Sequence, residues 1–295
     1  MNVLVTGSNG FIGHHVCEFF RQKGCYVVGL GRKKESVALV DEYLNIDLDT
    51  NDIFDYQPTN HIDAIIHLAA DMRKEPYCVD VVSANCSGTQ RLLQFCEQNK
   101  IETFLQLSSL PVIGHPVNHP ITENHPICPP TVYHCTKVME EILADYAMRT
   151  KKIRTASFRI SAPVGIGMNL KTIFPTFVKY AVENQDIAIY GKGLRQQTYI
   201  HVDDISSGLY NALLSSKCSG VYNLSSYNRI SNLDLAKLCV SLLNSKSKIV
   251  FNGLSDVYDS DIWDVSLDKI MRDTDFRPQI SLEYCINELA NCFKK

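Results

Sequence analysis

The segment "NVLVTGSNGFIG", residues 2–13, decides the fold of this chain. Residues 2–6 are a short, mainly apolar run that predicts a buried β-strand. Gly7, Gly10 and Gly13 follow, and apolar side chains at helical spacing begin at Phe11. Glycine lets the backbone turn tightly and approach a bound group, and a helix N-terminus offers N–H groups to an anion. Close helix packing is an alternative use of this spacing, but a strand, glycine turn and helix in this order predict a dinucleotide site.

Strands and helices alternate through the first half of the chain. Apolar runs predict further strands at residues 26–30, 43–48, 64–69, 103–108 and 154–160. Helical spacing predicts helices at 80–99 and 131–150, separated by a proline-rich loop and a strand. The pattern predicts an α/β fold: a doubly wound parallel sheet (Rossmann fold) with a smaller C-terminal α/β region. We expect residues 1–162 to bind the dinucleotide, with segments around 195–224 returning to this domain, and residues 163–295 to bind substrate.

Composition excludes several classes of protein. A net charge of −3 over 295 residues indicates neither a nucleic-acid partner nor a membrane surface partner. There is no apolar run long enough for a transmembrane helix, and the N-terminus lacks the features of a signal peptide. The eleven cysteines include no Cys-x-x-Cys pair, so we expect mostly buried, reduced thiols in a cytoplasmic protein and no metal site. His115, His119 and His125 lie in the proline-rich loop without tight ligand spacing, and we expect that loop to cover a substrate.

The end of the second strand bears on the choice of cofactor. An NAD site usually places an acid there, to bind the ribose 2′-hydroxyl. This chain has "GLGRKKE" at residues 29–35, with Gly31 followed by Arg32, Lys33 and Lys34. Basic side chains suit the 2′-phosphate of NADP, so the sequence favours NADP over NAD, with Arg32 as the clamp. A solvated basic turn is the alternative interpretation.

The stretch "YHCTK", residues 133–137, is a candidate for acid–base chemistry. Tyr133 and Lys137 lie four positions apart, which places both on one face of a helix. A chain of this composition contains about one such pair by chance, so its context has to decide. Tyr133 falls in the first turn of the predicted helix, where a neighbouring ammonium and the helix N-terminus both favour the phenolate. We therefore expect Tyr133 to exchange a proton with a hydroxyl or carbonyl oxygen.

Several segments in order resemble the extended short-chain dehydrogenase/reductases, the NAD(P)-dependent epimerase/dehydratase family. They are "TGSNGFIG" (6–13), "HLAA" (67–70), "SSLPVIG" (108–114), "YHCTK", "YIHVDDI" (199–205) and "DTDFRP" (273–278). The resemblance covers nearly the whole chain. It implies an enzyme that acts on a small molecule, mostly a nucleotide sugar in this family, and a homodimer joined by the helices near 80–99 and 131–150.

The resemblance also implies roles for particular residues. Tyr133, Lys137 and Ser109 would be catalytic, and Ser109, Leu110 and Tyr133 would contact the substrate. Arg195 is a further candidate for substrate contact, from its position near Gln197. Asn85 would support the helix near the active site, and Pro163 would lie near the nicotinamide. The full set of implied cofactor contacts is Gly7, Gly10, Phe11, Ile12, Gly13, Arg32, Asp47, Leu48, Leu68, Ala69, Ala70, Asn85, Tyr133, Lys137 and Pro163.

The chain departs from the family where substrate phosphates are usually bound. Ala162 stands where Asn is frequent, Gln197 stands where Arg is frequent, and "GLSDVYDSDIWD" (253–264) lacks a recognisable Arg-x-Gly-Asp. Arg195 or Lys192 could substitute for the missing donors. Leu110 and Pro111 replace the Asp-Glu pair of the 4,6-dehydratases, which disfavours dehydration.

Four activities remain open after these departures. A keto-sugar reductase that consumes NADPH is favoured, because of Arg32. A nucleotide-sugar epimerase is the first alternative, and a reductase of a non-nucleotide ketone or aldehyde is the second. A cofactor-sensing regulatory protein is the alternative from another class. The presence of Tyr133, Lys137 and Ser109 together favours an enzyme over a sensor.

Overall fold

A parallel sheet of seven strands forms the centre of the molecule. The computed structural model describes residues 1–73, 75 and 77–294. The strand order is β10-β6-β5-β4-β1-β2-β3, and every neighbouring pair in it is parallel. The strands are β1 (Asn2–Thr6), β2 (Tyr26–Gly31), β3 (Glu42–Asn45), β4 (Ala64–His67), β5 (Thr103–Ser109), β6 (Arg154–Ile160) and β10 (Gly220–Leu224). The order reverses between β1 and β4, and such a point opens a crevice at the carboxyl ends of the strands.

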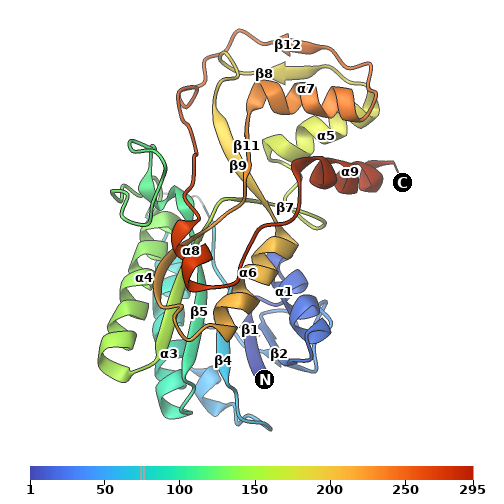
Figure 1. Ribbon diagram of the computed structural model, residues 1–295. Helices are drawn as coiled ribbons and strands as arrows, with labels where there is room; N and C mark the ends of the chain where they lie inside the picture. Colours follow the sequence, from blue (N-terminus) through green and yellow to red (C-terminus); the bar gives the residue numbers. More distant parts are fainter. Residues whose placement is uncertain (74, 76, 295) are drawn as a thin grey trace.

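Helices cover both faces of this sheet (Figure 1). Helices α1 (Phe11–Gln22) and α6 (Val202–Leu214) pack together on one face, while α3 (Gly88–Gln98) and α4 (Val132–Lys151) lie on the other. Side chains alternate along β1: Val3 and Val5 join the core under α1 and α6, and Leu4 joins the core under α3. A strand buried on both faces explains why the opening segment is apolar without interruption. The expected doubly wound sheet is confirmed.

The predicted strands 43–48 and 64–69 are shorter in the structure. β4 ends at His67 because the N–H groups of Leu68 and Ala69 both donate to Thr6 Oγ1, at 3.1 Å each, and leave the ladder. β3 ends at Asn45, and the chain then turns where the Thr50 N–H donates to the carbonyl of Asp47. The predicted helix 80–99 is present as α2 (Val79–Val82), a π-helical turn η2 (Ser83–Ser87) and α3.

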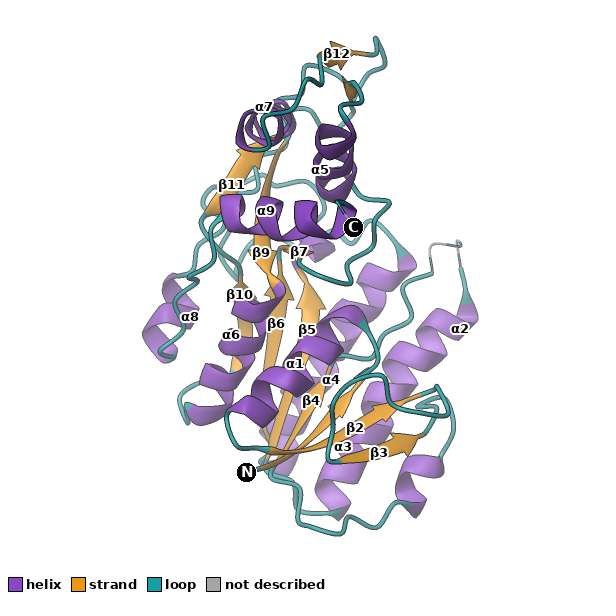
Figure 2. Ribbon diagram, turned by 90° about the vertical axis from the view of Figure 1, so that its right-hand side faces the viewer, coloured by secondary structure: helices purple, strands orange, loops and turns teal. Residues whose placement is uncertain are grey.

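The C-terminal part of the chain builds a second, smaller layer beyond the carboxyl ends of the main strands (Figures 1 and 2). Its hydrophobic core is formed mainly by α5 (Ile173–Glu183), α7 (Asn232–Leu242) and α9 (Leu282–Phe293). Two small sheets accompany these helices: β7 (Ala162–Val164), β9 (Gln196–His201) and β11 (Asn228–Ser231) in one, and β8 (Ile187–Ile189) and β12 (Ile249–Phe251) in the other. The remaining elements are η1 (Asp52–Asp55), η3 (Leu110–Ile113) and α8 (Asp268–Asp273).

The chain returns from this layer to the main sheet. β10 pairs with β6 as the seventh strand, and α6 packs on α1, whereas β9 stays in the smaller sheet. Within the described residues, no helix has both the length and the apolar composition needed to cross a membrane. All eleven cysteines are free, and six of them are buried.

Candidate active site

The glycine loop lies against the segment that follows β4. Gly7 has φ +68°, and a Cβ built on it would stand 2.8 Å from the Ala69 nitrogen. A Cβ on Gly13 would stand 2.1 Å from the Gly7 carbonyl oxygen, so α1 and the loop touch with no room for a side chain. The first turn of α1 carries neither an acidic residue nor a side-chain cap that would compete for its N–H groups. This cradle fits the pyrophosphate of a dinucleotide.

A buried histidine ties β1 and β4 together directly beneath this loop. Thr6 Oγ1 accepts from two backbone N–H groups, so its own hydrogen is free for His67 Nδ1, 2.7 Å away. His67 Nε2 then donates to Thr89 Oγ1 at 3.0 Å. Burial lowers the pKa of His67 to about 3, and the nearby Lys137 adds to this effect, so the ring is neutral at physiological pH.

The basic turn after β2 is held next to the glycine loop by Asn9. Asn9 Oδ1 accepts from the Val37 N–H at 2.7 Å, and Asn9 Nδ2 donates to the carbonyl of Glu35 at 3.1 Å. Arg32, at the start of this turn, is exposed. Its charge helps to lower the pKa of Asp71, which is lowered chiefly by the hydrogen bonds from Arg73. The turn is therefore ordered around a charged, accessible Arg32.

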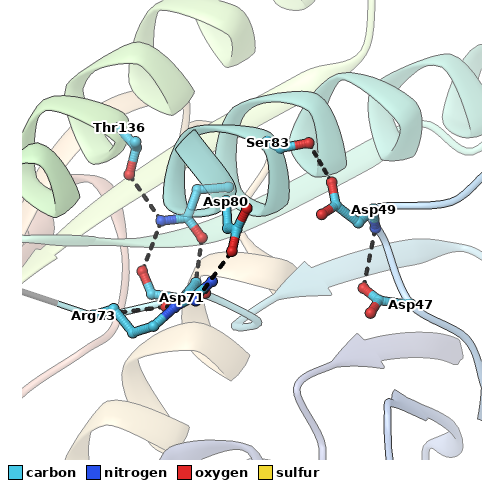
Figure 3. A network of polar contacts seen from close by, with 8 residues as sticks. Asp47, Asp49, Asp71, Arg73, Asp80, Ser83 and Thr136 are labelled. Atoms are coloured by element: carbon cyan, nitrogen blue, oxygen red, sulfur yellow. Dashed lines mark hydrogen bonds and ion pairs between the residues drawn. The ribbon is translucent and has the colours of Figure 1, made fainter. Parts of the chain in front are cut away.

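Polar contacts join the chain after β3 and β4 to the helix that contains η2 (Figure 3). Ser83 Oγ donates to Asp49, and the Asp49 N–H donates to Asp47 Oδ1 at 3.1 Å. Arg73 pairs with both Asp71 and Asp80, at 2.6 and 3.2 Å. Of the residues implied as cofactor contacts in this region, Asp47 is partly accessible and Ala70 is exposed, while Leu48 is buried in the core.

Asn85 connects these segments to α4. Its Oδ1 accepts from the Asp71 N–H at 2.7 Å, and its Nδ2 donates to the Asp71 carbonyl at 3.0 Å and to Thr136 Oγ1 at 2.8 Å. Thr136 lies one position before Lys137 on α4. The side chain of Asn85 therefore fixes the exit of β4 relative to the helix that carries the Tyr–Lys pair.

Tyr133 lies in the first turn of α4, as predicted, and Lys137 lies beneath it. The N-cap of this helix is Thr131, whose side chain accepts from the His134 N–H. Lys137 Nζ lies 5.9 Å from the centre of the Tyr133 ring, and its side chain is 3% exposed. Burial raises the pKa of Tyr133, Lys137 lowers it, and Glu140 raises it again, so that the net pKa lies above the ordinary value. The expectation that the phenolate is favoured is therefore wrong as a net effect, because burial outweighs the ammonium.

Glu140 is the site residue that sequence reasoning missed. Its Oε2 accepts from Lys137 Nζ at 2.9 Å, and its side chain is 1% exposed. The signal in the sequence was an acid three positions after the lysine, on the same helical face. An adjacent acid, Glu141, accepts from Ser108 Oγ and pairs with the buried Arg159 at 2.7 Å. Two neighbouring glutamates thus have different partners.

Ser109 and Leu110 meet at the carboxyl end of β5, where η3 begins. Helix α4, which carries Tyr133, packs against both β5 and η3, the two elements that meet at Ser109. Ser109 is partly accessible, whereas the side chain of Leu110 is buried with Val112, Ile113 and Ile121. Pro163 lies in β7, opposite Ile200 of β9. Trp263 packs against the same small cluster as Leu110.

Arg195 lies two positions before Gln197, the position where the family often has arginine. With the Gln197 amide oriented to satisfy both groups, its oxygen accepts from Arg195 Nη2 at 3.2 Å and Nε at 3.3 Å. Arg195 and Gln197 are two apart and share a face of the chain, which permits this contact. The Arg195 guanidinium stands 4.9 Å from the centre of the Tyr258 ring, and the His115 ring stacks on Tyr258 at 5.3 Å.

The acidic segment 253–264 contacts both the turn at residues 192–194 and the proline-rich loop. Asp259 accepts from the N–H groups of Lys192 at 2.7 Å and Leu194 at 2.8 Å, and Asp261 contacts His115 at 3.1 Å. The proline-rich loop is therefore tied to the C-terminal layer through His115. The described residues contain no group of three His, Cys, Asp or Glu side chains placed to hold a metal ion.

Comparison with known proteins gives a family and a fold. The sequence model described as the NAD dependent epimerase/dehydratase family matches residues 3–225. A low-salt glycan biosynthesis protein, Agl12, from Haloferax volcanii is 27% identical over 85% of this chain and 86% of its own length. A dTDP-glucose 4,6-dehydratase from Streptomyces niveus is 26% identical over 80% of this chain and 76% of its own.

A solved structure has the same fold over the whole chain. It is a variant of the UDP-glucuronic acid 4-epimerase of Bacillus cereus, in complex with UDP-4-deoxy-4-fluoro-glucuronic acid and NAD. Its TM-score is 0.86 at 22% identity, covering 100% of this chain and 99% of that one. At this level of identity, the similarity establishes a common fold.

Proposed function

This chain belongs to the NAD dependent epimerase/dehydratase family, a family of short-chain dehydrogenase/reductase enzymes, and from that premise we propose that it is an NAD-dependent nucleotide-sugar epimerase. The observation that carries this proposal is the set Ser109, Tyr133 and Lys137 without any acid directly after Ser109. Dehydration needs a further acid and base at that place, where this chain has Leu110 and Pro111. Epimerisation needs only one proton-exchanging group at the reacting carbon, used in both directions.

The cofactor would lie along the crevice at the carboxyl ends of β1 and β4. Gly7, Gly10 and Gly13 would cradle its pyrophosphate, and Ala69 and Ala70 would line the groove. Asp47 would contact the adenine, and Pro163 would lie near the nicotinamide. When bound, NAD supplies a reversible acceptor for two electrons at the carbon that carries the substrate hydroxyl.

Tyr133 and Ser109 would act on the oxygen of that carbon. Tyr133 Oη takes the hydroxyl proton when the carbon is oxidised and returns it when the carbon is reduced on its other face. Ser109 Oγ donates a hydrogen bond to the same oxygen and limits its movement. Lys137 stabilises the phenolate, which is the form Tyr133 has before it takes the proton and again after it returns it.

We propose that the sugar of the substrate lies between the main sheet and the C-terminal layer. The nucleotide part of the substrate would contact the C-terminal layer. Residues 163–295 provide this second wall, apart from the segments that return to the main sheet. Arg195 is a cation two positions before Gln197, and it would bind a phosphate of the nucleotide.

Product analysis tests the proposal directly. Purified protein is incubated with a panel of UDP- and dTDP-sugars, and the products are resolved by chromatography and NMR, because an epimer has the same mass as its substrate. We expect a change of stereochemistry with no net consumption of NAD(H). A product two hydrogens heavier, formed with stoichiometric loss of NADPH, would establish the reductase instead. Turnover only of a non-nucleotide carbonyl would contradict the substrate class.

Tyr133→Phe should lower turnover by roughly 10²-fold or more, because a positioned acid–base group contributes about that much. The variant should still bind the dinucleotide, as measured by protein fluorescence during a titration. Tyr146→Phe is the matched control, because Tyr146 is an exposed tyrosine on the same helix. Unchanged turnover in Tyr133→Phe would refute the catalytic role and favour the cofactor-sensing alternative.

The exposed Arg32 favours a second candidate, an NADPH-dependent keto-sugar reductase. A 2′-phosphate beside the ordered basic turn would bind its guanidinium. Separate titrations with NAD(H) and NADP(H) distinguish the two candidates. Tighter binding of NADP(H), lost selectively in Arg32→Ala, supports the reductase; equal affinity or tighter binding of NAD(H) supports the epimerase.

A further inference from the structure

The catalytic lysine carries a second, buried partner that the chemistry above does not use. Lys137 Nζ donates to Glu140 Oε2 at 2.9 Å, and the two side chains are 3% and 1% exposed. Both belong to α4, whose buried face packs against η2. An ion pair with this little access to water is screened much less than an exposed pair.

Only one of the two carboxyl oxygens of Glu140 is satisfied. Glu140 Oε1 is buried and has no hydrogen-bond partner. A buried, half-satisfied carboxylate is costly, and a proton on it removes much of that cost. Burial accordingly raises the pKa of Glu140 to about 7, against the opposing effect of Lys137 and with a further contribution from Glu141.

Among the described residues, several titratable groups lie around the pair of Lys137 and Glu140. On α4 these groups are Tyr133, Glu140 and Glu141; on η2 there is Cys86, and on β4 there is His67. Burial raises the pKa of Cys86 to about 11 and lowers that of His67 to about 3, so both are neutral at physiological pH. Glu141 pairs with Arg159 instead of with Lys137.

Given the proposed function, we propose that Glu140 is a positioning residue whose protonation sets how strongly Lys137 acts on Tyr133. The ionised carboxylate holds the ammonium in place and cancels part of its field at the tyrosine ring. The protonated carboxyl leaves that field at full strength. Glu140 exchanges one proton with solvent, and no bond between heavy atoms changes.

The proposal predicts a shift in the ionisation of Tyr133 in Glu140→Gln, which removes the charge and keeps the shape. Without the carboxylate, the tyrosine should titrate at lower pH, by on the order of one pH unit. The ultraviolet difference titration of tyrosinate reports this directly, taken as the full chain minus Tyr133→Phe, in the wild-type and Glu140→Gln backgrounds. The acid limb of the kcat/KM profile should shift in the same direction.

Glu97→Gln is the matched control. It breaks the exposed pair between Glu97 and Lys151, at the far end of α4, and should leave the tyrosine midpoint unchanged. A midpoint in Glu140→Gln equal to or above that of the wild type overturns the proposal. If Glu140→Gln does not fold, the same titration is made on Glu140→Leu. If neither variant folds, the proposed effect of Glu140 on Tyr133 is rejected.

Thermal stability gives a readout independent of activity. Glu140 binds its proton more tightly in the folded chain than in the unfolded chain, where its pKa is 4.5. The wild type should therefore lose stability relative to Glu140→Gln as the pH rises from 4.5 to about 7. Parallel melting curves across this range would contradict the proposal. Because neither titration needs a substrate, failure to turn over any sugar would refute the epimerase and leave this test intact.

Discussion

Gly7 shows how a residue without a side chain lets two backbone segments touch, at the place where we propose that the cofactor binds. Its φ of +68° suits glycine, and any Cβ would meet the backbone of Ala69. This close contact between Gly7 and Ala69 holds the glycine loop against the segment that follows β4. The sequence predicts the turn, whereas the contact with Ala69 depends on β1 and β4 being neighbours in the sheet.

Gly7→Ala should weaken dinucleotide binding by at least roughly tenfold, because the loop must move away from Ala69. It should also destabilise the fold by more than the roughly 1–2 kcal/mol that a left-handed backbone costs an L-residue. Gly24→Ala is the control, with a similar φ of +78° and no atom within 4 Å of the added Cβ. Thermal melting and a fluorescence titration measure both effects. Equal behaviour of the two variants would show that the contact with Ala69 has no role.

The helical segment from Val79 to Gln98 is interrupted in a way that its sequence does not predict. Its sequence predicts one continuous helix, and the structure inserts the π-helical turn Ser83–Ser87 in the middle. Such turns are frequently found at functional sites, since they redirect side chains. Here the turn contains Asn85, whose three hydrogen bonds join the exit of β4 to α4.

Asn85→Ala should lower the free energy of unfolding by about 1–3 kcal/mol, because it leaves the N–H and carbonyl of Asp71 without their partner. Turnover should fall as well, since α4 carries Tyr133. Thr136→Val is the control: it removes one of the three bonds and should have the smaller effect on stability. Chemical denaturation measures the difference. A larger loss in Thr136→Val would mean that Asn85 does not anchor this region.

At the scale of the molecule, one face of α4 is unusually apolar. Met139, Ile142 and Tyr146 are 44%, 56% and 54% exposed, at helical spacing, and Val82 of the adjoining α2 is 44% exposed. This stripe lies on the two helices through which the family resemblance implies a homodimer. We propose that a second copy of the chain covers this stripe.

Ile142→Glu should raise the dimer dissociation constant by at least roughly tenfold, because it places a charge in an apolar contact. Sedimentation velocity over a range of protein concentrations measures this. Val250→Glu is the control, since Val250 is 39% exposed on β12, in the C-terminal layer. A wild-type protein that sediments as a monomer at every concentration would refute the dimer.

The sequence by itself determined the alternation of strands and helices in the first half of the chain, the glycine turn and the place of Tyr133 on its helix. These features follow from local chemistry: apolar runs, glycine at a tight turn, and helical spacing. It also located the departures at Ala162 and Gln197, because these are single positions in known segments.

The tertiary structure alone decided which residues far apart in the sequence are in contact, and which of several possible partners a side chain has. It kept β9 in the smaller sheet, placed Asp259 on the N–H groups of Lys192 and Leu194, and buried Glu140 against Lys137. It also reversed the expected acidity of Tyr133, because the loss of water around a side chain depends on everything packed against it. Burial and long-range contact are properties of the whole chain, and no local pattern encodes them.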